Sequence, residues 1–220
     1  MKTIILSCTS LLEFVEAAQK SQGTSYPVIS VDRSFHTEPE NMKAHIAGIL
    51  KDLPEEVDTV LVAMAFCGGV WDHVTAPRRL VIPRFDDCVS ILLHTGDDYC
   101  PNRKELGHLY LFENDPDTFS ALTIPRGEGL GDEFKGLDPD FLHHMLFDNY
   151  KNMDIIDTGL NDCYSEDYVI KAQAYADEIE ADLGYAEGGI GLLEKLVSGR
   201  WDDQFIVAEK GQLIRHGDFF

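Results

Sequence analysis

Four residues whose side chains bind soft metals occur at comparable points of the sequence, each shortly after a predicted β-strand. They are Cys8, His36, Cys67 and Cys88. Three thiolates and one imidazole form a complete tetrahedral set for zinc, and three thiolates with an open position suit an iron–sulfur cluster. The chain has no Cys-x-x-Cys pair, so this prediction depends on the strands. The competing interpretation is that buried cysteines simply fill the core as small apolar side chains.

Other side chains near these cysteines could complete a reactive site. Gly68 and Gly69 follow the third candidate ligand and could let the backbone approach a cofactor or an anion, although an ordinary tight turn is the alternative. Arg84 and Asp87 stand just before the fourth ligand. Arg84 could hold a substrate carboxylate or phosphate, and Asp87 could orient a ligand or move a proton. A surface ion pair is the competing interpretation for these two residues.

A second group of candidates ends another predicted strand. Asp157, Thr158 and Gly159 place a carboxylate and a hydroxyl at a strand end, where both could face a cofactor or substrate. Asp157 could instead cap the following turn. Glu13 comes soon after the first predicted strand and is a further candidate for the pocket. One of these carboxylates, or Asp87, would be the group that moves protons.

Alternating strands and helices are predicted to position these residues. Short apolar runs predict strands over 3–7, 26–31, 59–65, 80–83, 108–112, 153–156 and 204–208. Apolar residues at helical spacing predict helices over about 11–18, 42–50, 88–93, 141–150, 165–183 and 190–197. The alternation predicts an α/β fold with a mostly parallel sheet flanked by helices, or two repeated Rossmann-like halves. In such sheets, sites form beyond the carboxyl ends of the strands.

The length of 220 residues fits one α/β domain or two small lobes. A stretch rich in Gly and Pro over 125–139 predicts a long loop or lid. In the two-lobe interpretation this loop joins lobes of about 1–124 and 140–220.

Charge and composition narrow the list of partners. The chain has 39 acidic and 18 basic residues, a net charge of −21, which repels nucleic acid and anionic membrane surfaces. The acidic residues are spread along the whole chain, so the charge also fits a role in solubility. No apolar run reaches the ~18 residues of a membrane span, and five cysteines argue against a disulfide framework. We therefore expect a cytoplasmic protein, with a homodimer as the common default.

Several blocks of the sequence resemble the domain-of-unknown-function family 1638 (DUF1638). They are residues 66–69, 80–84 with 87–88, 156–160 and 191–202. The resemblance extends from Cys8 to Trp201, and His36 matches a family position after the second strand. Similar proteins are often encoded, in anaerobic bacteria and methanogens, beside corrinoid-dependent methyltransferases. The resemblance therefore implies a role in methyl-group or corrinoid metabolism.

Two functional hypotheses follow. The first is a metal-dependent enzyme or metal-bound accessory protein of anaerobic one-carbon metabolism. Zinc is the favoured metal, an iron–sulfur cluster the alternative, and methyltransferase-type, lyase or hydrolase chemistry on a small molecule the expected activity. The second is a binding protein that carries a small molecule or corrinoid to a methyltransferase and uses the same crevice without turnover.

Overall fold

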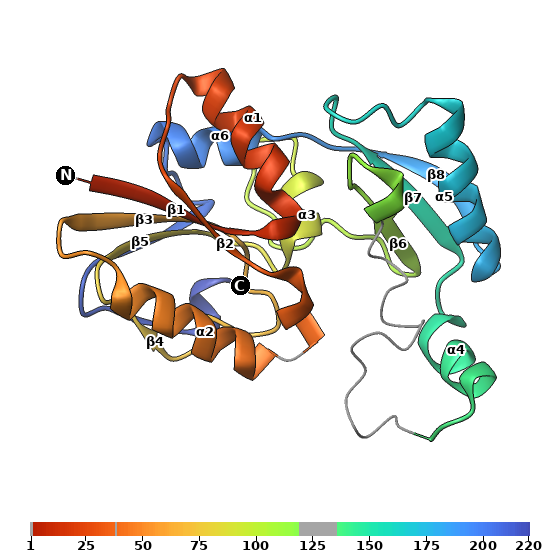
Figure 1. The fold of residues 1–220 in the computed structure, drawn as a ribbon, viewed down its shortest axis with the longest axis horizontal. Helices are drawn as coiled ribbons and strands as arrows, with labels where there is room; N and C mark the ends of the chain where they lie inside the picture. Colours follow the sequence, from red (N-terminus) through yellow and green to blue (C-terminus); the bar gives the residue numbers. More distant parts are fainter. Residues whose placement is uncertain (1, 38, 119–135) are drawn as a thin grey trace. The chain divides into compact units, whose positions relative to one another are not determined.

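The computed structural model describes residues 2–37, 39–118 and 136–220, which form two compact units (Figure 1). Unit 1 comprises Met1–Arg103 and Ile190–Phe220, and unit 2 comprises Lys104–Gly189. These boundaries differ from those of the expected lobes, about 1–124 and 140–220, because the last segment of the chain returns to unit 1. The loop expected over 125–139 lies mostly outside the described residues.

A five-stranded sheet with the order β2-β1-β3-β5-β9 forms the centre of unit 1. The first four strands are parallel to their neighbours, and β9 runs antiparallel to β5. Apolar side chains on both faces of β1 are buried, as expected for a strand covered on both sides. The mostly parallel α/β sheet is thus confirmed. Its strands are β1 (Lys2–Cys8), β2 (Val28–Val31), β3 (Val57–Ala63), β5 (Arg79–Pro83) and β9 (Phe205–Ala208).

Helices cover both faces of this sheet (Figure 1). Helices α1 and α6 lie on one face and α2 lies on the other. Both α1 and α6 end at a glycine in the left-handed conformation, Gly23 and Gly199, which is a common helix stop. The helices of unit 1 are α1 (Leu12–Gln22), α2 (Pro39–Asp52), α3 (Cys88–Leu92) and α6 (Gly191–Ser198).

Smaller elements complete unit 1. A two-stranded antiparallel sheet pairs β4 (Val74–Thr75) with β10 (Leu213–Ile214), and the sequence did not predict it because two residues are too short for a periodic signal. Three 3₁₀ helices follow strands or close the chain. They are η1 (Thr9–Leu11), η2 (Arg33–Thr37) and η5 (His216–Asp218).

Unit 2 is built on a parallel three-stranded sheet with the order β6-β7-β8. Its core combines side chains of the strands with Tyr168, Ala172 and Ala176 of α5. The helix expected over 165–183 is wrong in its last five residues, because α5 ends at Glu178 and β8 begins at Asp182. Glu180 between them has a left-handed φ of 56°, which a helix does not continue through. The elements are β6 (His108–Leu111), η3 (Pro116–Thr118), α4 (Pro139–Phe147), β7 (Asn152–Asp157), α5 (Glu166–Glu178) and β8 (Asp182–Glu187).

The sheets of the two units differ in size and composition, since one has five strands with an antiparallel edge and the other has three parallel strands. The repetition of two Rossmann-like halves stays a prediction. Among the helices in the described parts of the chain, none combines the length and the apolarity needed to cross a membrane.

Candidate functional site

The four predicted metal ligands follow four neighbouring strands of the unit 1 sheet. Taken in the spatial order β2-β1-β3-β5, these strands lead to His36, Cys8, Cys67 and Cys88 in turn. Cys8 is the last residue of β1, His36 lies in η2, Cys67 lies in the turn after β3, and Cys88 begins α3. Residues far apart in the sequence therefore meet at the carboxyl edge of one parallel sheet, which is where α/β folds form their sites.

The segments after β3 and β5 remain paired beyond the strands and bring two cysteines together. The backbone N–H of Phe66 donates to the carbonyl of Phe85 at 2.9 Å, and that of Cys67 donates to the carbonyl of Asp86 at 2.8 Å. The Sγ atoms of Cys67 and Cys88 lie 3.9 Å apart. Both side chains are buried.

The turn that carries Cys67 needs glycine at its next two positions. Cys67 has φ 44°, Gly68 has φ 73° and Gly69 has φ 101°, all in the region that favours glycine. A Cβ atom at Gly68 would lie 3.3 Å from Cγ of Pro39 at the start of α2, so the turn also packs closely against that helix. These contacts explain both glycines structurally, and their role in cofactor binding stays a prediction.

The loops after β1 and β2 are joined in a similar way. The backbone N–H of Arg33 donates to Oγ1 of Thr9 at 2.9 Å, which links η2 to η1. Sγ of Cys8 lies 3.6 Å from Nε2 of His36 and 3.5 Å from Oγ of Ser10. Cys8 is fully buried, whereas His36 is exposed. The second pair of predicted ligands therefore has one buried and one accessible member.

The charges of these four residues depend on one another. A hydrogen bond with Cys88 and another with His36 lower the pKa of Cys8 to about 4, against the effect of burial. The bond to Cys8 and the charges of Cys67, Cys8 and Asp87 raise the pKa of His36 to about 8. Hydrogen bonds with Cys67 and Cys8, together with burial, raise the pKa of Cys88 well above its ordinary value. Without a cation, the cluster therefore pairs a Cys8 thiolate with a His36 imidazolium and keeps Cys88 protonated.

The chemistry of this donor set fits a soft metal, because it consists of three thiols and one imidazole. In the part of the chain that the structure describes, no three His, Cys, Asp or Glu side chains are arranged so that they could already hold an ion. The predicted ligands instead form two close pairs, Cys8 with His36 and Cys67 with Cys88, and the contact between Cys8 and Cys88 links the pairs.

Arg84 contacts two backbone carbonyls and an aromatic ring, and its role as an anion clamp stays a prediction. Its Nε donates to the carbonyl of Asp218 at 2.8 Å, and its Nη1 donates to the carbonyl of Asp203 at 2.9 Å. The guanidinium also lies over the ring of Tyr99, 4.3 Å from the centroid. Through these contacts Arg84, which follows β5, binds the C-terminal segment of unit 1.

Asp87 and Glu13 differ in their surroundings. Oδ1 of Asp87 accepts from the backbone N–H of Ser90 at 3.0 Å and so caps α3. The charge of Asp87 also helps to raise the pKa of His36, which places Asp87 within electrostatic reach of the predicted ligands. Glu13 is exposed in the first turn of α1.

Asp157, Thr158 and Gly159 belong to unit 2 and follow β7, so they sit on a different sheet from the cysteines. Oδ1 of Asp157 accepts from the backbone N–H of Gly159 at 3.0 Å, and Oδ2 accepts from the hydroxyl of Tyr164 at 2.7 Å. Oγ1 of Thr158 accepts from the N–H of Leu160 at 3.3 Å. Both side chains thus stabilise their own turn, and their role in binding a cofactor or substrate stays a prediction.

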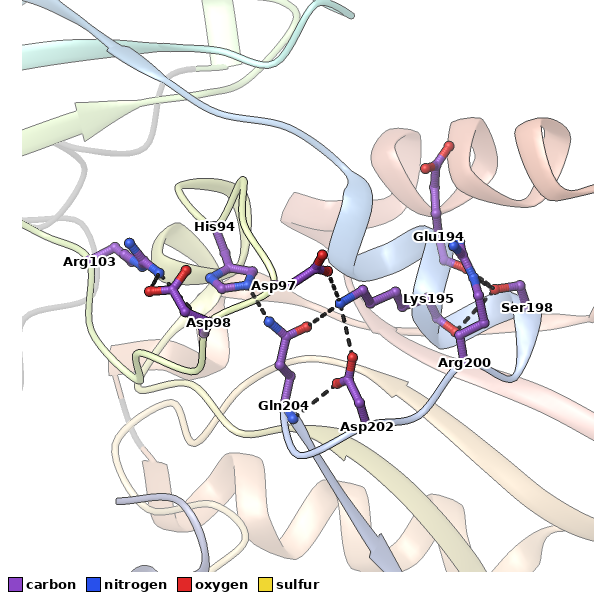
Figure 2. A network of polar contacts seen from close by, with 10 residues as sticks. All are labelled: His94, Asp97, Asp98, Arg103, Glu194, Lys195, Ser198, Arg200, Asp202 and Gln204. Atoms are coloured by element: carbon purple, nitrogen blue, oxygen red, sulfur yellow. Dashed lines mark hydrogen bonds and ion pairs between the residues drawn. The ribbon is translucent and has the colours of Figure 1, made fainter.

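A polar network that the sequence did not predict, buried at Gln204 and His94 and exposed at Asp97 and Asp202, lies beyond the end of α3 (Figure 2). Nζ of Lys195 contacts Asp97 at 2.7 Å, Asp202 at 2.9 Å and Oε1 of Gln204 at 2.9 Å. Nε2 of Gln204 donates to Nε2 of His94, just beyond α3, at 2.6 Å. The network therefore helps to position the helix that begins with the fourth predicted ligand. The block over 191–202 contains Lys195 and Asp202 of this network, but His94, Asp97 and Gln204 lie outside it.

Comparison with known proteins identifies a family. No curated protein and no solved structure was found to match the chain. A family model described as a protein of unknown function, DUF1638, matches residues 30–197 of the 220. The matched range contains His36, Cys67 and Cys88, and Cys8 precedes it. Because the match covers most of the chain, this protein belongs to the DUF1638 family.

Proposed function

We propose that the chain binds one transition-metal ion through Cys8, His36, Cys67 and Cys88, with zinc as the first choice. The observation that supports this proposal is that the four residues follow four adjacent strands and approach one another in two pairs. In a tetrahedral zinc site, two sulfur ligands lie roughly 3.8 Å apart, and a sulfur and a nitrogen lie roughly 3.6 Å apart. The observed separations are 3.9 Å and 3.6 Å. Binding would require the two pairs to close on a common ion.

The protonation of the cluster would make metal binding depend on pH. Metal ligands must be deprotonated, so a cation competes with protons for the thiols. Cys8 has a pKa of about 4 and is already a thiolate at neutral pH, whereas His36 and Cys88 hold protons that would be released to solvent when the metal binds. A bound zinc ion would supply a Lewis acid.

His36 is the ligand that we propose to exchange with a substrate. The three cysteines are buried, and His36 is exposed in the short helix η2. Three buried thiolates would therefore retain the metal while the imidazole leaves, and this arrangement favours an enzyme over a purely structural site. Anaerobic methyl-group or corrinoid metabolism, the setting that we propose, rests on the family resemblance alone.

Metal content tests the proposal. We expect protein purified without oxygen to contain one zinc ion per chain by mass spectrometry. Cys67→Ala and Cys88→Ala should lose the metal. Cys100→Ala and Cys163→Ala should keep it, because neither thiol belongs to the cluster and they control for the loss of a cysteine as such.

Two results would redirect or end the proposal. Iron in place of zinc, with visible absorbance that disappears in Cys67→Ala, would identify the iron–sulfur alternative. If the wild-type protein holds no metal, even after incubation with zinc and removal of the excess, the proposal is wrong and the thiols are core side chains.

A further inference from the structure

Two solvent-exposed tyrosines of unit 2 stack on each other, Tyr164 in the turn that follows β7 and Tyr185 within β8. Tyr164 is 65% exposed and Tyr185 is 45% exposed, and their ring centroids lie 4.9 Å apart with 19° between the planes. The hydroxyl of Tyr164 donates to Asp157 at 2.7 Å, and that of Tyr185 donates to the carbonyl of Cys163 at 3.3 Å. The rings are therefore held in place although much of their surface meets solvent. We call Tyr164, Tyr185, Asp157 and Glu187 the tyrosine platform.

Carboxylates border the two rings. Asp157 and Glu187 are paired in register at the ends of β7 and β8. Because alternate residues of a strand share a face, Glu187 points to the same side as Tyr185, and its register partner Asp157 does so too. Hydrogen bonds from Tyr164 and from the N–H of Gly159 lower the pKa of Asp157, so this carboxylate is ionised at neutral pH. An aromatic surface thus lies beside fixed negative charge.

Unit 2 as a whole is strongly acidic and also exposes several large hydrophobic side chains. Lys104–Gly189 contains 20 acidic residues against five lysines and arginines, which gives −15 of the −21 charges of the chain. The acidic residues are spread along the sequence, but the excess of acid over base is concentrated in unit 2. Of the ten large hydrophobic residues that are exposed in the described chain, eight lie in unit 2.

We propose that the tyrosine platform binds an arginine side chain presented by a basic partner protein. A guanidinium stacks on the face of an aromatic ring and pairs with carboxylates at the same time. Tyrosines that are already held in place lose little conformational entropy on binding, which is why they are frequent at the centres of interfaces. The negative field of unit 2 would attract an extended basic surface and speed its association.

The openness of the platform favours a protein over a small cation. A small ligand is normally enclosed over most of its surface, whereas a ring that is 65% exposed offers one open face. A partner protein can cover that face and supply contacts around it. This inference concerns unit 2 alone and does not depend on a metal at the cysteines of unit 1.

Binding of a labelled arginine-rich peptide to the full chain at physiological ionic strength, followed by fluorescence anisotropy, tests the proposal. We expect Tyr164→Ala to raise the Kd about three- to fivefold, the range of one cation–π contact, without any change in charge. Tyr164→Phe should lose less affinity than Tyr164→Ala, because it keeps the ring and gives up only the hydrogen bond to Asp157. Ile170→Ala is the matched control, since Ile170 is exposed on α5 of the same unit but lies outside the platform. Glu187→Gln should also weaken binding.

Other outcomes would overturn the proposal. Equal Kd values for wild type, Tyr164→Ala and Tyr185→Ala would mean that only the general charge of unit 2 attracts the peptide. No measurable binding by the wild type would also overturn it. Circular dichroism and metal content of each variant, both expected to be unchanged, would separate a local loss of binding from misfolding and from any failure of the metal proposal.

Discussion

Replacing Gln204 with leucine tests the polar network that anchors α3 (Figure 2). The side chain of Gln204 is 0% exposed, donates to His94 and accepts from Lys195. Leucine has a similar volume and removes both hydrogen bonds. His94 is 2% exposed, so its ring nitrogen would be left buried without this partner, which costs about 1–3 kcal/mol. Lys195 keeps two carboxylate partners and should lose little.

We therefore expect Gln204→Leu to lower the free energy of unfolding by about 2 kcal/mol, measured by urea denaturation. A double-mutant cycle with His94→Leu isolates the bond between the two side chains. The cycle should give a coupling free energy of about 1 kcal/mol, because the two residues are in direct contact. A loss below about 0.5 kcal/mol for the single variant, or strictly additive effects, would refute this reading of the network.

Two further predictions concern unit 2. Asp157→Asn should lower the pKa of Tyr164 from about 12 toward the ordinary 10.0, because the carboxylate that accepts from the phenol favours its protonated form. Ultraviolet titration of the tyrosines measures this shift. An unchanged titration curve would contradict the prediction. Gly184→Ala should destabilise the protein by about 1–2 kcal/mol, because its Cβ would overlap with Oδ1 of Asp154, whose carboxylate is held by a hydrogen bond with His108. The control Gly189→Ala, with open space around the Cβ, should unfold at the same urea concentration as wild type.

The central sheet and its helices could be predicted because their signals are local. The apolar runs that became β1, β3 and β5 lie entirely within short windows of sequence, as do the helical patterns of α2 and α6. Strand β8 was missed because its sequence, Asp-Leu-Gly-Tyr-Ala-Glu, lacks β-branched residues. Gly184 within it is explained by Asp154 of the neighbouring strand, which no local pattern reveals.

In the candidate site, too, the sequence predicts features that depend on neighbouring residues but not contacts between distant segments. Cysteines near strand ends could be read from the sequence, but their grouping into pairs depends on the spatial order β2-β1-β3-β5. The predicted role of Arg84 as an anion clamp could not anticipate its partners Asp203 and Asp218, which lie more than a hundred residues further along the chain. Sequence reasoning also missed the tyrosine platform, because Tyr164 and Tyr185 meet only through the pairing of β7 with β8.

X-ray absorption spectroscopy of the zinc-loaded protein tests the metal proposal most directly. We predict a first coordination sphere of three sulfur atoms at about 2.3 Å and one nitrogen atom at about 2.0–2.1 Å. His36→Ala should replace that nitrogen while keeping the three sulfurs. A sphere made only of nitrogen and oxygen, or one with fewer than three sulfurs, would contradict the proposal that Cys8, Cys67 and Cys88 share one ion.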